Sequence, residues 1–151
     1  MENILEQLQR HEGSVIEKGR HMPYTDSEGH LTIGYGHNLE YGIPQFIADQ
    51  LLRYDYAQAV QELRQSYVWY DELDKVRQDV LSNMCFNLGI ERFGGFVRMI
   101  AAIEAGDYEE AAIEMLDSKW ATQVGDRADE LSEQMRTCER SPNAKTATGH
   151  L

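Results

Sequence analysis

Two acidic side chains and a hydroxyl near the N-terminus are of the types that acid–base chemistry on a sugar linkage requires. Glu12 lies where an early helix is expected to end, Asp26 lies in a turn, and Thr32 lies in a predicted strand. In glycoside hydrolysis one protonated carboxyl donates to the leaving oxygen, while a second carboxylate handles water or the sugar cation. This signal is weak alone, because the chain has 26 acidic residues and Asp26 also suits a tight turn.

The elements that must position these residues begin with a short helix. Ile4, Leu5 and Leu8 recur at helical spacing, and Gly13 ends the predicted helix just after Glu12. The segment Leu31–Gly36 is β-branched, aromatic and punctuated by glycine, which favours a short hairpin or small antiparallel sheet.

From Pro44 onward the hydrophobic pattern is helical. Pro44 suits the first position of a long helix that extends into the mid-sixties, and a turn follows at residues 67–70. An apolar stripe from Leu73 to Leu88 predicts a second helix that ends at Gly89. Further predicted elements are helices at about 93–104, 108–116 and 126–136, and a brief turn at 118–123.

These patterns predict an α+β fold that is mostly helical. We expect one domain over residues 1–137, with a small β-containing lobe at 14–42 and a larger helical lobe at 44–137. Residues 138–151 lose all periodicity and are predicted to form a flexible tail.

Composition argues against several classes of partner. The chain has 14 Lys and Arg against 26 Asp and Glu, a net charge of −12, which disfavours nucleic acid and anionic membranes. No window approaches the ~20 apolar residues of a membrane span, so stable membrane insertion is not expected.

Cysteine and histidine usage predicts neither a metal nor a cofactor. Cys85 and Cys138 are too few for a disulfide framework or a four-ligand zinc site, although one bridge between them remains an alternative. Cys85 lies in an apolar run and is predicted to be buried. No pair of the histidines at 11, 21, 30 and 37 has the spacing of a zinc-binding helix.

The segment around Glu12 and Asp26 resembles the signature of phage-type lysozymes, the endolysins. His11-Glu12-Gly13 is followed by Asp26-x-x-Gly29-x-x-Thr32-Ile33-Gly34-x-Gly36. The similarity continues, in the family's order, at Asn83–Gly89, Phe96, Gly106–Tyr108, Ser118–Trp120, Gln123 and Asp126–Ala128. It covers nearly the whole chain except the tail and implies a lysozyme-like fold.

The resemblance implies a muramidase that cuts the β-1,4 bond between N-acetylmuramic acid and N-acetylglucosamine in bacterial peptidoglycan. By this likeness Glu12 is the general acid, and Asp26 with Thr32 positions the attacking water. The family inverts the anomeric centre, which implies carboxyl groups about 6.5–9.5 Å apart.

Further site residues follow from the same resemblance. Substrate contacts are expected from Gly36, Asn38, Phe86 and Asn87. Arg127 is expected to approach Glu12 from the helical lobe, or else to serve as a structural ion pair. His37 is expected to brace the hairpin. Phe86 has a second interpretation as a core residue, because an aromatic side chain at helical spacing usually packs inside.

One departure from the family is the length of the segment between the two carboxyl groups. Thirteen residues separate Glu12 from Asp26, more than the usual family spacing. Our hypothesis is that Lys18, Arg20 and His21 form a basic lip beside an acidic cleft; the alternative is a solvated loop.

The expected partner is bacterial peptidoglycan, acted on by a monomer. The first residues include Glu2 and Glu6 and no apolar stretch of signal-peptide length, so synthesis in the host cytoplasm is expected. Access to the wall would then need a membrane lesion made by a holin-type protein, as in the family's usual scheme. The competing functions are a lytic transglycosylase and a non-catalytic protein that binds the wall.

Overall fold

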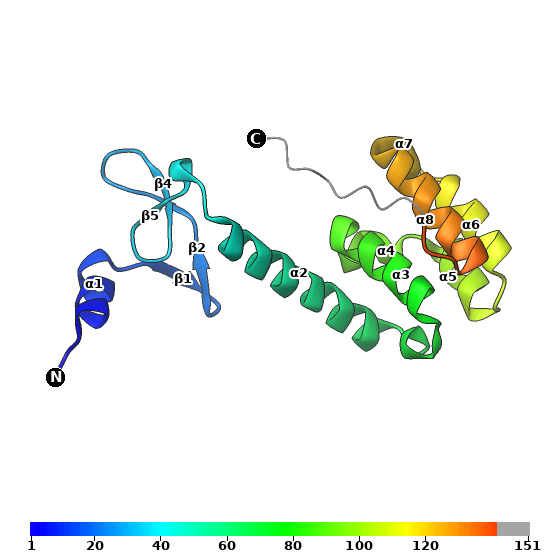
Figure 1. Ribbon diagram of the computed structural model, residues 1–151, viewed down its shortest axis with the longest axis horizontal. Coiled ribbons are helices and arrows are strands. Elements are labelled where there is room, and N and C mark those ends of the chain that lie inside the picture. The colour runs from blue at the N-terminus through cyan, green and yellow to red at the C-terminus, as the bar shows by residue number, and fades with distance from the viewer. Residues whose placement is uncertain (142–151) are drawn as a thin grey trace. The chain divides into compact units, whose positions relative to one another are not determined.

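The computed structural model describes residues 1–141 and divides the chain into two compact units, Met1–Leu51 and a second that begins at Leu52 (Figure 1). The first unit contains short antiparallel strands and the second is helical. The predicted α+β, mostly helical class is therefore confirmed.

The first unit opens with helix α1 (Ile4–Glu12). Its N-terminus is a capping box, in which Asn3 Oδ1 accepts the Glu6 N–H at 3.0 Å and Glu6 Oε2 accepts the Asn3 N–H at 2.8 Å. Gly13 caps the C-terminus with φ of 64°. Glu12 is thus the last residue of the helix, as predicted.

Two small antiparallel sheets follow α1. Strands β1 (Val15–Glu17) and β2 (Arg20–Met22) form a hairpin. Strands β3 (Tyr24–Thr25), β4 (Leu31–Ile33) and β5 (His37–Asn38) form a sheet in that order, so the predicted strand at Leu31 is central. The extra length between Glu12 and Asp26 is therefore a β-hairpin, and its residues 15–21 are exposed, as the alternative of a solvated segment expected.

The turn of this hairpin explains its formation. Lys18 and Gly19 have φ of 49° and 76°, and a two-residue turn with positive φ at both positions has the twist that matches paired strands. A 3₁₀ turn, η1 (Leu39–Tyr41), then leads to Pro44, whose carbonyl accepts the first hydrogen bonds of the long helix α2 (Gln45–Ser66).

The second unit is built of helices around α3. After η2 (Tyr70–Glu72), α3 (Lys75–Leu88) starts at the N-cap Asp74 and ends at Gly89, as predicted. The remaining helices are α4 (Ile90–Gly94), α5 (Val97–Glu104), α6 (Tyr108–Leu116), α7 (Lys119–Val124) and α8 (Asp126–Thr137).

Two predicted elements in this unit are wrong. The single helix expected over 93–104 is broken between α4 and α5, because the pair Gly94–Gly95 disfavours a continuous helix. The brief turn expected at 118–123 is helix α7, which starts where the Ser118 hydroxyl accepts the Ala121 N–H at 3.1 Å.

The core of the second unit surrounds α3. Leu81, Met84 and Cys85 from α3 are buried with Leu63 from α2 and Phe93 from α4. Burial raises the pKa of the Cys85 thiol to about 11, which makes it inert. Both cysteines are free, so the alternative of a bridge between them does not hold. Among residues 1–141, no helix is long and apolar enough to cross a membrane.

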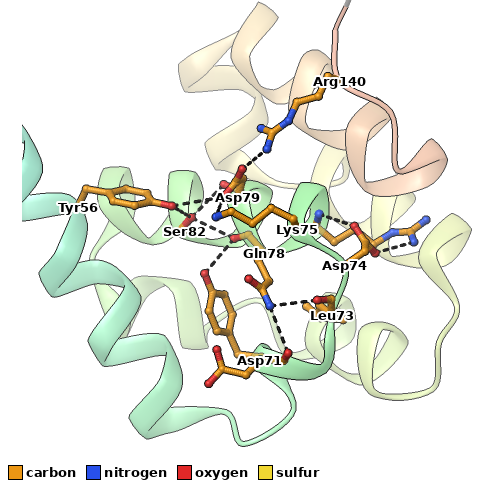
Figure 2. A network of polar contacts seen from close by, with 11 residues as sticks. Tyr56, Asp71, Leu73, Asp74, Lys75, Gln78, Asp79, Ser82 and Arg140 are labelled. Carbon is orange, nitrogen blue, oxygen red and sulfur yellow. Dashed lines mark hydrogen bonds and ion pairs between the residues drawn. The ribbon is translucent and has the colours of Figure 1, made fainter.

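A network of hydrogen bonds and ion pairs on α3 contacts the segment that follows α8 (Figure 2). The Asp79 carboxylate accepts from Lys75 Nζ at 2.6 Å and from the Tyr56 hydroxyl at 3.3 Å, and it pairs with Arg140. Gln134 also donates to Ser141 at 3.1 Å. The first residues of the predicted tail therefore contact the helical unit; residues 142–151 lie outside the described part of the chain.

Arg77 joins α3 to the C-terminal end of α8. Its Nε donates to Met135 O at 2.7 Å and its Nη2 to Arg136 O at 3.2 Å, while Nη1 pairs with Asp74 at 3.0 Å. The guanidinium carbon lies 3.6 Å from the Tyr108 ring centroid. One side chain thus satisfies two carbonyls in the last turn of α8 and contacts α6.

Replacing Arg77 with Met should lower the free energy of unfolding by about 2 kcal/mol or more, because two helix carbonyls lose a charged donor. Urea unfolding followed by circular dichroism measures this change. Arg64→Met is the matched control, because its pair with Asp71 is exposed, and its effect should be much smaller. Equal effects of the two substitutions would contradict the role of Arg77.

Candidate active site

Asp26 is held by the backbone of the turn between β3 and β4. Its Oδ1 accepts the N–H of Glu28 at 2.9 Å and the N–H of His30 at 2.8 Å, and its own N–H donates to His30 O at 2.9 Å. Within residues 1–141 both side-chain bonds go to Oδ1, so Oδ2 is left to bind a water or a substrate group.

These bonds keep Asp26 ionised. Backbone hydrogen bonds, above all from the His30 N–H, lower the pKa of the Asp26 carboxyl below its ordinary value. The stability linked to this shift is present above the ordinary pKa of about 3.9 and is lost as pH falls through the lowered pKa. An ionised carboxylate accepts hydrogen bonds from water and can act as a base. At mildly acidic pH it carries no proton that it could donate.

Thr32 is tied to the backbone of the same residue, His30. Its side chain is 3% exposed on β4, and its hydroxyl donates to His30 O at 3.0 Å. Because that proton is used, Thr32 Oγ1 acts as an acceptor toward a further group. The turn therefore brings Asp26 and Thr32 together through His30.

Glu12 lies against the next hairpin, between β4 and β5. A Cβ at position 36 would lie 2.9 Å from Glu12 Oε2 and 3.2 Å from its carboxyl carbon, and Gly36 has φ of 82°. Only glycine leaves this space and adopts this backbone without strain. Gly36, predicted as a substrate contact, thus makes room for the exposed Glu12 carboxyl.

The neighbouring residues of β5 have structural contacts. His37 Nε2 lies 2.9 Å from Gly42 O, which ties β5 to the end of η1. Asn38 Oδ1 accepts the Glu40 N–H at 2.9 Å and caps η1, so its amide nitrogen is the atom left to donate. Substrate binding by Asn38 remains a prediction.

The predicted site residues of the second unit lie on α3 and α8. Arg127 donates to Asn83 Oδ1 from Nε at 2.9 Å and from Nη2 at 2.7 Å. Phe86 is 40% exposed and lines, with Tyr56, Asn83 and Arg127, a cavity of about 560 Å³. Phe86 is therefore not a core residue. The expected approach of Arg127 to Glu12 remains a prediction.

Sequence reasoning missed two positioning side chains. Asn83 orients Arg127 across 44 positions of sequence, and Trp120 Nε1 donates to Asn87 Oδ1 at 2.8 Å. Trp120 is 4% exposed, so it anchors the core, as its aromatic character predicts, and also fixes the Asn87 amide. The signal in the sequence was the placement of Asn83 and Asn87 four residues apart on the helix that carries the apolar stripe.

A second cavity, of about 690 Å³, lies between α5 and α7 of this unit. Its lining includes Phe96, Met99, Glu114 and Trp120. No cluster of three His, Cys, Asp or Glu side chains able to hold a metal occurs in the part of the chain that is described.

Comparison with known proteins assigns this sequence to a family. The sequence model of the phage lysozyme family matches residues 14–138, a range that contains Asp26 and Thr32 and begins just after Glu12. The chain is 26% identical over 159 positions to probable T4-type lysozyme 2 of Dictyostelium discoideum, covering 85% of this chain and 91% of that protein. It is 25% identical to probable T4-type lysozyme 1 of the same organism, with the same coverage. Because the match spans most of the sequence, the chain belongs to the phage lysozyme family.

Proposed function

We propose that the protein is a muramidase that hydrolyses β-1,4 bonds between N-acetylmuramic acid and N-acetylglucosamine in bacterial peptidoglycan. The observation that carries the proposal is the turn in which Asp26, held ionised, accepts the His30 N–H while Thr32 donates to the His30 carbonyl. Glu12 supplies the second carboxyl from the end of α1.

The arrangement of acceptors suits the placement of a nucleophilic water. Asp26 Oδ2 and Thr32 Oγ1 are both hydrogen-bond acceptors, so one water can donate a hydrogen bond to each of them. Its lone pair then points at the anomeric carbon. Asp26 takes the proton as the bond to carbon forms, and Glu12 protonates the leaving oxygen. Attack by water opposite the leaving group inverts the anomeric centre.

The remaining predicted residues bind or support the substrate. Gly36, Asn38, Phe86 and Asn87 contact the glycan in this proposal, and His37 braces β5. Arg127 supports Glu12 in this proposal.

The biological setting we propose is lysis of a bacterial host. The protein acts as a monomer on the wall, after synthesis in the host cytoplasm and passage through a lesion made by a holin-type membrane protein. It uses no cofactor, metal or nucleic acid.

The proposal is tested by Glu12→Gln on chloroform-treated Gram-negative cells and on isolated peptidoglycan. Loss of the general acid should reduce the rate of lysis by about 100-fold or more. Glu28→Gln is the matched control, because it removes an exposed carboxylate from the turn that holds Asp26 and should retain activity. Wild-type products should have saturated reducing ends by mass spectrometry.

Two results would overturn this assignment in different ways. Products with 1,6-anhydro ends, lighter by one water, would identify a lytic transglycosylase. Lysis by Glu12→Gln at the wild-type rate would indicate a non-catalytic protein that binds the wall.

A pair of substitutions at Asp26 separates its charge from its role in the turn. Asp26→Asn keeps an oxygen that can accept the Glu28 and His30 N–H groups but loses the charge that strengthens these bonds, so it should lose activity and melt slightly below the wild type. Asp26→Ala also loses the acceptor, so it should lose activity and melt at a lower temperature than Asp26→Asn. An active Asp26→Asn variant would exclude Asp26 as the base.

Gly36→Ala should reduce activity at least about tenfold, because its Cβ would displace the Glu12 carboxyl. Its positive φ should also cost about 1 kcal/mol of stability. Gly42→Ala is the control, since Gly42 has φ of 71° and no atom near its Cβ position. It should lose similar stability, measured by urea unfolding, and keep its activity per folded molecule. Equal activity per folded molecule in both variants would show that Gly36 does not determine the position of the Glu12 carboxyl.

A further inference from the structure

In the sequence, the β1–β2 hairpin lies between the two carboxyl-bearing residues of the proposed site. β1 begins three residues after Glu12, and β2 ends four residues before Asp26. Val15 pairs with Met22 at the base, and Glu17 pairs with Arg20 next to the turn. The base of the hairpin is therefore tied by short connections to both carboxyl-bearing segments.

The register separates the side chains of the hairpin onto two faces. Directly paired residues share a face and successive residues alternate, so Ile16 and His21 lie on one face and Glu17 and Arg20 on the other. Lys18 lies in the turn. The expected basic lip of Lys18, Arg20 and His21 is therefore not one continuous surface.

The face that bears Ile16 and His21 is extended by Tyr35. The His21 ring packs edge-on against Tyr35, with ring centroids 5.1 Å apart and planes at 73°. Tyr35 directly precedes Gly36, the residue against which the Glu12 carboxyl lies. Ile16 is 55% exposed and Tyr35 is 45% exposed. We name the surface of Ile16, His21 and Tyr35 the hairpin wall.

The chemistry of the hairpin wall suits a sugar ring. Its apolar and aromatic surface can pack against the C–H face and N-acetyl methyl of a hexosamine, while the Tyr35 hydroxyl and the imidazole can hydrogen-bond to hydroxyls. It has no carboxylate, Lys or Arg side chain, so it lacks the fixed charge that would select an ionic group. Tyr35 adjoins Gly36 in the chain, and the Cβ position of Gly36 lies against Glu12, which points to a sugar near the scissile bond.

We propose that the hairpin wall binds a hexosamine ring of the glycan strand beside Glu12. This proposal rests on the proposed function and adds to it a binding surface made by the extra length between Glu12 and Asp26. The wall acts on affinity and touches none of the reacting atoms.

Binding is measured with the full-length Glu12→Gln protein and the β-1,4-linked tetramer of N-acetylglucosamine, by titration followed by NMR. His21→Ala, Tyr35→Leu and Ile16→Ser, each added to Glu12→Gln, should raise Kd about fivefold. Glu17→Gln on the opposite face and Lys18→Asn in the turn should each leave Kd within about twofold. In the active protein the wall substitutions should raise KM and change kcat little.

Failure of the hairpin wall is distinguishable from failure of the proposed function. Absence of tetramer binding at millimolar concentration, or unchanged Kd in all three wall variants with native circular dichroism, overturns the wall even if Glu12→Gln abolishes hydrolysis. A loss of affinity in Lys18→Asn as large as that in His21→Ala would also overturn the hairpin wall, because binding would then depend on the positive charge in the turn. A wild-type protein that binds the tetramer through the wall but cleaves no peptidoglycan leaves the surface intact and overturns the muramidase.

Discussion

The backbone of His30 is the constraint on which the chemistry of the first unit depends. Its N–H donates to the Asp26 carboxylate, and its carbonyl accepts both the Asp26 N–H and the Thr32 hydroxyl. Backbone groups in a paired hairpin have little freedom, so both side chains take their orientation from the β3–β4 pairing itself. The carboxylate is kept ionised by amides rather than by a mobile cation.

The two carboxyl groups lie in contrasting settings. Asp26 accepts amide hydrogen bonds, whereas Glu12 is exposed at a helix end and lies against a glycine that leaves room for its carboxyl group. Differences of environment are how proteins assign two carboxyl groups to separate acid and base roles. The contrast is created by two hairpins that share strand β4, with Asp26 at one turn and Gly36 at the other.

The second unit positions its polar residues differently, through side chains joined across helices. Asn83 holds Arg127, and Trp120 holds Asn87, so α3 is connected to α8 and α7 by side-chain hydrogen bonds. Arg77 adds a backbone connection to the end of α8. These contacts depend on a packed core around α3, which makes the positions of Arg127 and Asn87 sensitive to the stability of the whole unit.

The sequence by itself determined the elements whose signals are local. Helical periodicity predicted α1, α2, α3, α6 and α8, with a glycine marking the end of α1 and of α3, and the run Leu31–Gly36 predicted the central strand. It also predicted the buried Cys85 and, through a family motif, the residues of the candidate site. The helix predicted over 93–104 failed because a paired glycine interrupts an otherwise regular pattern.

Only the tertiary structure decided which distant groups meet. The contact of Gly36 with Glu12, the clamp of Asn83 on Arg127, and the face that His21 presents to Tyr35 depend on turns and strand register. Shifting a strand by one residue would exchange the two faces of the β1–β2 hairpin without changing its composition. Periodicity depends on neighbouring residues and is visible in the sequence, whereas these contacts arise from chain reversal and packing among all the elements at once.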